Sequence, residues 1–326
     1  MNARDRLLNA LTLKPVDRPP VSGLITSITR DVMEKTGVED PEFHTNPQAM
    51  AAIAGGCYEI LGLESIKIPF CMTVEASALG AGIFYGDFFP QVKQTIDETI
   101  LEQELSIENR GRVPVVLEAI RILKERYKEE VAVVSAVVGP LSLLGMLLGF
   151  EKTFLTLMDE PQQFRSWMNF ATNIGIQHAK LQMQAGADAI QIGEAGASGD
   201  LTSPQVYHDF ILPCHQRIST AISVPTVMHI CGKNTRHLEH IQNAGMDAFS
   251  FDEKTDIAAL SRHLKGKVAR VGYVPTDLLL NGTPEGIYAF SKTCLSDVDV
   301  LNAGCTIPPR TPTENIRAMV AAVKPS

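Results

Sequence analysis

His229 and Cys231 lie one residue apart in the stretch TVMHICGKN (residues 226–234), and both side chains are preferred zinc ligands. Successive side chains of a strand point to opposite faces, so these two would share one face while Ile230 points to the other. The apolar run stops at Gly232, which places the pair at the carboxyl end of an expected strand. A packed cysteine beside a hydrogen-bonded core histidine is the alternative, so a third ligand is needed to favour a metal site.

Cys305 supplies a third ligand, because it ends a second apolar run, VDVLNAGCTIPP (residues 298–309). If both runs are strands of one parallel barrel, their carboxyl ends meet at the same mouth. One histidine and two thiolates suit a catalytic Zn²⁺ with an open fourth position, whereas Mg²⁺ or Ca²⁺ would require oxygen ligands. Cys71, after the apolar run SIKIPF, is the competing third ligand.

Acidic residues also follow the expected strands. Asp252 and Glu253 lie in FSFDEKTD, where either could complete the coordination of a resting metal or accept a proton. A carboxylate that caps the next helix is the alternative interpretation. Glu194 and Asp200 follow another apolar run and are further candidates to line the mouth.

Short apolar runs alternate with longer amphipathic segments along the chain. The cap Asn46 before Pro47 predicts a helix over Asn46–Leu61, and apolar spacing predicts another over Val113–Tyr127. Repeated strand and helix units favour a (β/α)8 TIM barrel. A doubly wound open sheet is disfavoured, since no G-x-G-x-x-G fingerprint follows the first run. The expected strands are Pro20–Gly23, Ser65–Pro69, Val131–Val137, Asp188–Gly193, Thr226–Ile230, Asp247–Asp252, Val268–Gly272 and Asp297–Asn302.

Residues 71–99 depart from this alternation, because several glycines and Pro90 lie there among aromatic residues. We expect an inserted hairpin or lid after the second strand, above a pocket at the carboxyl ends of the strands. The N-terminal segment predicts a short helix that covers the bottom of the barrel. No linker composition divides the chain, so residues 1–326 are expected to form a single domain.

The composition excludes several classes of protein. With 326 residues, 45% hydrophobic and 20% charged, the chain can bury a large core, and its net charge of −8 offers no basic surface for nucleic acid. No apolar run is long enough for a membrane span or a signal peptide, which predicts a cytoplasmic protein. The six cysteines show no disulfide framework. Three of them lie in expected helices and are interpreted as packing residues: Cys57, Cys214 and Cys294.

HICGKN followed by NAGCTIPPRTPTENI resembles the zinc methyltransferases of the uroporphyrinogen decarboxylase superfamily, most closely the methylcobamide:coenzyme M methyltransferases. The resemblance spans nearly the whole chain and includes RLLNALTLKPVDRPPV, HTNPQAMAAIA, GLESIKIPFCMTVEASALG and GRVPVVLEAIRILK. It implies a uroporphyrinogen decarboxylase-like TIM barrel with His229, Cys231 and Cys305 as zinc ligands. The decarboxylase members carry an Arg-rich stretch after the first strand, whereas SGLITSITRD has only Arg30, which disfavours tetrapyrrole decarboxylation.

The resemblance also implies the reaction and its partners. A methylated corrinoid on a separate carrier protein would be the donor, and coenzyme M, 2-mercaptoethanesulfonate, would be the acceptor, as in methanogenesis. Arg310 is a candidate for the sulfonate, but it could equally pair with Glu314. Two alternatives stay open: a zinc methyltransferase with another thiol acceptor, and a non-catalytic corrinoid or tetrapyrrole-binding module.

Overall fold

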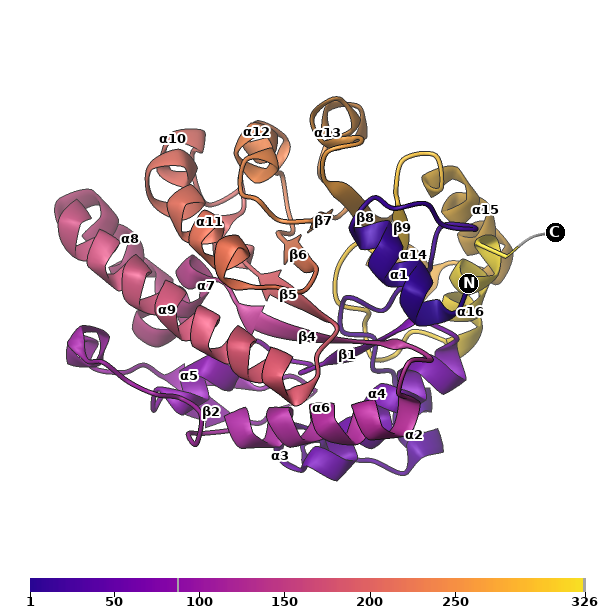
Figure 1. Ribbon diagram of the computed structural model, residues 1–326, viewed down its shortest axis with the longest axis horizontal. Coiled ribbons are helices and arrows are strands. Elements are labelled where there is room, and N and C mark those ends of the chain that lie inside the picture. The colour runs from indigo at the N-terminus through magenta and orange to yellow at the C-terminus, as the bar shows by residue number, and fades with distance from the viewer. Residues whose placement is uncertain (87, 325–326) are drawn as a thin grey trace.

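The computed structural model describes residues 1–86 and 88–324, and its centre is a parallel sheet. Neighbouring strands pair in the order β1-β4-β5-β6-β7-β8-β9, so the chain adds one strand at a time around the sheet. Figure 1 shows helices on the outer side of these strands. The strands are β1 (Ser65–Ile68), β4 (Ala132–Val138), β5 (Ala189–Gly193), β6 (Thr226–His229), β7 (Ala248–Ser250), β8 (Ala269–Val274) and β9 (Val300–Ala303).

The segment 20–23 lies between the two edges of this sheet. Val21 forms a parallel bridge with Leu301 of β9, and its carbonyl oxygen accepts a hydrogen bond from the amide of Glu64, next to β1. The sequence predicted a full strand over Pro20–Gly23, and only this bridge forms. Pro20 has no N–H, and the N–H of Val21 donates to the carboxylate of Glu64, so neither can extend a ladder. The sheet thus curves through at least half a barrel, consistent with a TIM barrel.

The helices begin largely where the sequence predicts. Asn46 accepts a hydrogen bond from the amide of Ala49 and caps α4, which has Pro47 in its first turn, and α6 has the predicted bounds. The helices are α1 (Ala3–Leu11), α2 (Arg30–Thr36), α3 (Glu42–Thr45), α4 (Pro47–Leu61), α5 (Val74–Ala78), α6 (Val113–Tyr127), α7 (Pro140–Leu148), α8 (Phe150–Asp159), α9 (Pro161–Ala185), α10 (Pro204–Val206), α11 (Leu212–Ala221), α12 (Leu238–Gln242), α13 (Ile257–Leu264), α14 (Thr276–Asn281), α15 (Pro284–Cys294) and α16 (Thr313–Ala322).

The interior of the curved sheet has its own small apolar core. Leu7 and Leu11 of α1 belong to one buried cluster with Val134, Ala189 and Val227, which point inward from β4, β5 and β6. Helix α1 contacts β4 most and also β1, β8 and β9. This confirms the prediction that the N-terminal helix covers one end of the barrel. The same contacts fix which face of each strand points inside, because every second residue of a strand shares a face.

Residues 71–99 contain α5 and an antiparallel hairpin of β2 (Gly82–Phe84) and β3 (Gln91–Gln94). The sequence predicted a hairpin or a lid in this insertion, and the hairpin is present; residue 87 lies outside the described residues. A role as a lid stays a prediction. Among residues 1–86 and 88–324, no single helix is long and apolar enough to cross a membrane; only α7 and α8 taken together pass that test, and they are bent by 111°.

Candidate metal centre

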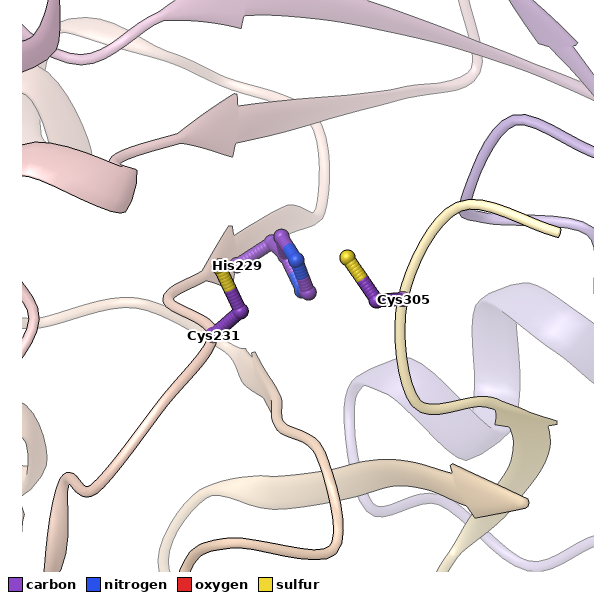
Figure 2. A group of neighbouring side chains, drawn as sticks. All are labelled: His229, Cys231 and Cys305. Atoms are coloured by element: carbon purple, nitrogen blue, oxygen red, sulfur yellow. The ribbon is translucent and has the colours of Figure 1, made fainter. Parts of the chain in front are cut away.

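The three predicted ligands come together at the carboxyl ends of the strands. His229 is the last residue of β6, Cys231 follows two residues later, and Cys305 lies two residues beyond β9. Figure 2 shows Cys305 approaching from the opposite side and pointing toward the other two. One ligand atom from each residue lies within 4.8 Å of the others. Ligands of a tetrahedral zinc lie about 3.5–3.8 Å apart, so small side-chain movements would bring all three onto one ion.

His229 is fixed in orientation by the neighbouring strand. Val227, two residues earlier, belongs to the inner core, so His229 also points inside, and its Nδ1 lies 3.0 Å from Oγ of Ser250 on β7. This hydrogen bond leaves Nε2 for a metal. Metal-binding histidines usually hold their second ring nitrogen in this way, which sets the ring orientation and the tautomer.

Cys231 and Cys305 lie close enough for each to shift the pKa of the other. Interaction with Cys305, together with burial, raises the pKa of Cys231. Interaction with Cys231 lowers the pKa of Cys305; burial opposes this shift, and His229 adds to it. Cysteine binds a metal as the thiolate, so metal binding would remove any proton that remains on the pair.

Gly232 and Gly304 let the two ligand loops approach their neighbours. Gly232 has φ +94°, and a Cβ there would lie 2.4 Å from Oδ2 of Asp200. A Cβ on Gly304 would lie 3.1 Å from the Cα of Asp252, tighter than ordinary packing. Side chains at these two positions would push Cys231 or Cys305 away from the shared centre.

The two predicted carboxylates differ in their surroundings. Asp252 is buried and accepts hydrogen bonds from the amides of Gly232 (2.7 Å) and Lys254 (3.1 Å), while burial raises its pKa. Its carboxylate thus holds the loop after Cys231 in place. Glu253 is exposed, and its carboxylate lies beside Gly304, next to Cys305. Neither belongs to the cluster of three ligand atoms.

Glu194 and Asp200 have different positions. Glu194 is fully buried and lines the cavity at the mouth, where it accepts hydrogen bonds from the amide and hydroxyl of Ser142 at 2.8 and 2.7 Å. His215 lies behind it, with Nε2 3.3 Å from Oε2. Asp200 accepts from the amide of Lys233 and supports the loop after Cys231 rather than the cavity wall.

Cys71, the competing third ligand, lines the same cavity but is not among the clustered ligand atoms. Arg112 Nη1 donates to its sulfur at 3.3 Å, and the hydroxyl of Thr73 donates at 3.4 Å. Burial opposes ionisation, but nearby His44, Arg112 and Thr73 outweigh it and lower the pKa of Cys71 to about 6.

The remaining cysteines are buried, and burial raises their pKa, as the packing interpretation requires. The pKa rises to about 12 for Cys57 and about 11 for Cys294, and it also rises for Cys214. The sulfonate candidate Arg310 is exposed and does not line the cavity. Among the described residues it forms no ion pair with Glu314.

The cavity beneath the three ligands has a volume of about 140 Å³. Three charged or amide side chains in its wall were missed by the sequence analysis: Lys67 on β1, Glu75 on α5 and Gln191 on β5. Lys67 and Gln191 interrupt the otherwise apolar runs SIKI and AIQIG, and this interruption is the sequence feature that could have indicated them. A polar residue inside an apolar strand either faces a site or carries a buried hydrogen bond.

A wider apolar groove of about 640 Å³ adjoins this cavity. Phe70, Cys71, Met72 and Thr306 line both spaces, so the groove leads toward the three ligands. Its outer wall comes from residues 89–93 at the end of the β2–β3 hairpin and from α7.

The family model described as uroporphyrinogen decarboxylase (URO-D) matches residues 2–325. The chain belongs to the uroporphyrinogen decarboxylase family. Within this family, relatives differ in activity. Methylcobamide:CoM methyltransferase MtaA of Methanosarcina barkeri is 35% identical over 98% of this chain and 96% of its own length. Methylcobamide:CoM methyltransferase MtbA of Methanosarcina acetivorans is 32% identical over 98% of this chain and 97% of its own length.

A uroporphyrinogen decarboxylase of Coxiella burnetii is more distant, at 26% identity over 98% of this chain and 94% of the relative. Among solved structures, a methyltransferase from Methanosarcina mazei has a TM-score of 0.95 at 33% identity, covering 99% of this chain and 98% of that one. This member of the uroporphyrinogen decarboxylase family is therefore more similar to these methyltransferases than to that decarboxylase.

Proposed function

We propose that this protein transfers a methyl group from a methylated corrinoid, presented by a carrier protein, to a small thiol, preferably coenzyme M. The observation that carries the proposal is the cluster of His229, Cys231 and Cys305 at the strand ends. It occurs in a chain that is 35% identical to a methylcobamide:CoM methyltransferase over nearly the full length of both.

We propose Zn²⁺ as the metal for this cluster, because one imidazole and two thiolates match its preferred donors. When bound, zinc would hold the substrate thiol as a thiolate at neutral pH. Cys231 and Cys305, both ionised, would cancel the charge of the dication. The substrate sulfur would therefore keep the electron density that attack on a methyl group requires. Ser250 would keep the ring of His229 oriented through the hydrogen bond to Nδ1.

The proposed transfer needs no reactant besides the thiol and the methylated corrinoid. The thiol S–H loses its proton, the sulfur lone pair forms the new carbon–sulfur bond, and the carbon–cobalt bond breaks with its electron pair left on cobalt. Asp252 and Glu253 are the proposed proton acceptors, with solvent as the alternative. Glu253 is better placed to accept a proton, because both carboxylate oxygens of Asp252 already accept backbone hydrogen bonds.

The groove beside the cavity gives the proposed corrinoid a route to the substrate sulfur. The face of a corrin macrocycle suits an apolar groove whose wall includes Phe70, Met72 and Phe89, and this groove shares residues with the thiol cavity. We propose that the β2–β3 hairpin acts as the lid of this groove within a single closed (β/α)8 domain over residues 1–326. A cytoplasmic location stays a proposal; its support is six cysteines without disulfides.

The decisive experiment is an assay of the zinc-loaded protein with methylcobalamin and 2-mercaptoethanesulfonate. Loss of the methyl–cobalt absorbance and formation of 2-(methylthio)ethanesulfonate, identified by mass spectrometry, are the expected results. Transfer to homocysteine but not to 2-mercaptoethanesulfonate would instead favour the alternative thiol acceptor. Binding of the corrinoid without methylation of any thiol would favour the binding-module alternative and reject the proposed function.

A further inference from the structure

Lys67 places a positive charge inside the cavity. It lies on β1, where its pairing partner on β4 is Val134 of the inner core, so Lys67 points inward as well. Its Nζ donates to Oγ1 of Thr26 at 3.1 Å and to the carbonyl oxygen of Pro69 at 3.0 Å. Both partners are neutral, and no carboxylate within residues 1–86 and 88–324 pairs with this ammonium group. An ammonium has three donors, so one is left for a ligand. A charge inside a protein is costly unless it is paired, which indicates an anionic ligand.

Gln191 on β5 faces the same cavity. Ala189, two residues earlier, points into the inner core, so Gln191 also points inward, and its side chain is 4% exposed. Its Oε1 is buried and has no hydrogen-bond partner among the described residues. The two ends of a carboxamide are interchangeable by a flip, so this group can offer an N–H to an anion. A buried polar group without a partner is unusual and indicates a missing ligand or water.

The acidic side chains of the cavity already have partners. Glu194 accepts the hydrogen bonds from Ser142 and faces His215, as described above. Glu75 accepts from the amide of Val138 at 3.1 Å and lies 2.8 Å from Nδ1 of His178. These contacts hold both carboxylates against the wall. Cys71 and Cys305 are the other groups near Lys67 that can carry a negative charge. Cys71 already accepts a hydrogen bond from Arg112, and Cys305 belongs to the proposed metal centre. Lys67 is thus the cationic group of the cavity that can attract an anionic substrate.

We propose that Lys67 and Gln191 bind the acidic end of the substrate, so that its thiol faces His229, Cys231 and Cys305. This inference rests on the proposed function and names the residues that would select a short thiol with a sulfonate or carboxylate. The size of the cavity supports that class, because about 140 Å³ is close to the roughly 150 Å³ of a cavity that holds benzene. A two-carbon thiol with a sulfonate group has a similar number of non-hydrogen atoms.

The test compares thiols that differ in charge and share a two-carbon chain: 2-mercaptoethanesulfonate, 2-mercaptoethanol and 2-aminoethanethiol. Lys67→Met keeps the length of the side chain and removes its charge, and Lys265→Met removes the same charge from an exposed position. Lys67→Met should raise KM for the sulfonate about 10- to 100-fold, as expected for a hydrogen bond to a charged group, and change KM for 2-mercaptoethanol little. Gln191→Leu should raise KM for the sulfonate about three- to tenfold, and Lys265→Met should behave as the native protein.

An equal loss with all three thiols, or loss of zinc from Lys67→Met, would overturn the inference and show that Lys67 supports the metal site instead. Calorimetry with 2-(methylthio)ethanesulfonate, which cannot form a thiolate, tests the inference without catalysis. Native protein should bind it at least tenfold more tightly than Lys67→Met, and equal binding would reject the proposed contact. If the native protein methylates no thiol yet shows this difference in binding, the proposed function fails and the assignment of Lys67 stands.

Discussion

Replacement of Cys305 by alanine should weaken zinc binding strongly while leaving the fold intact. Zinc sites built from cysteine and histidine bind with about 10–16 kcal/mol, and dividing this among four ligands gives roughly 2.5–4 kcal/mol for each. Loss of one thiolate should therefore raise the zinc Kd by about 10²- to 10³-fold. The position of Cys305 explains why the fold should persist: it is half-buried at the mouth, outside both apolar cores, and its loss leaves no core cavity.

Zinc content after dialysis against a moderate chelator, measured by inductively coupled plasma mass spectrometry, is the direct assay. The native protein should retain about one zinc per chain and Cys305→Ala almost none. Thermal unfolding of the metal-free proteins should differ by only a few degrees, because less than about 1 kcal/mol of packing is removed. The matched control is Cys71→Ala, which removes the other thiol of the same cavity. Full zinc in Cys305→Ala together with loss in Cys71→Ala would refute the choice of the third ligand.

The remaining predictions concern protons and one reactive thiol. Binding of 2-mercaptoethanesulfonate should release close to one proton to solvent, measured by calorimetry in buffers of different ionisation enthalpy. If a carboxylate of the protein takes this proton, the measured release is smaller, and it should return to about one proton in Glu253→Gln or Asp252→Asn. A release that stays small in both variants would show that neither carboxylate is the acceptor. Alkylation of Cys71 by iodoacetamide in zinc-loaded protein should follow an apparent pKa near 6, and Arg112→Gln should move this pKa upward; the same profile in both proteins would contradict the proposed role of the guanidinium. Burial lowers the pKa of His237 to about 4, so the folded state should lose stability, by up to about 3 kcal/mol, as pH falls from 6.5 toward 4. Urea unfolding at several pH values should show a smaller loss in His237→Gln, and an equal loss would assign the effect to other groups.

Local sequence predicted the elements that carry the ligands. The apolar runs that end at His229 and Ala303 form β6 and β9, and Asn46 with Pro47 predicts the start of α4, because alternation and capping act within a few residues. The prediction of a full strand over Pro20–Gly23 was wrong because of a contact with a residue far away in the sequence. The carboxylate of Glu64 accepts the N–H of Val21, so Val21 forms a single bridge with Leu301 and no ladder, and no pattern within residues 20–23 records that contact.

The site shows the same division between local and long-range information. The sequence by itself determined that His229 and Cys231 share a face at a strand end, and that Cys305 and Cys71 end other strands. Only the tertiary structure shows that Cys305, and not Cys71, lies with His229 and Cys231, since this depends on positions around the sheet that no local pattern encodes. The sequence shows that Lys67 and Gln191 are polar residues within apolar strands, but not that they face the cavity, because a polar residue in such a strand looks alike on either face. The packing of α1 against one end of the barrel fixes which face of each strand points inside. Because side chains alternate along a strand, Lys67 and Gln191 then point toward the cavity.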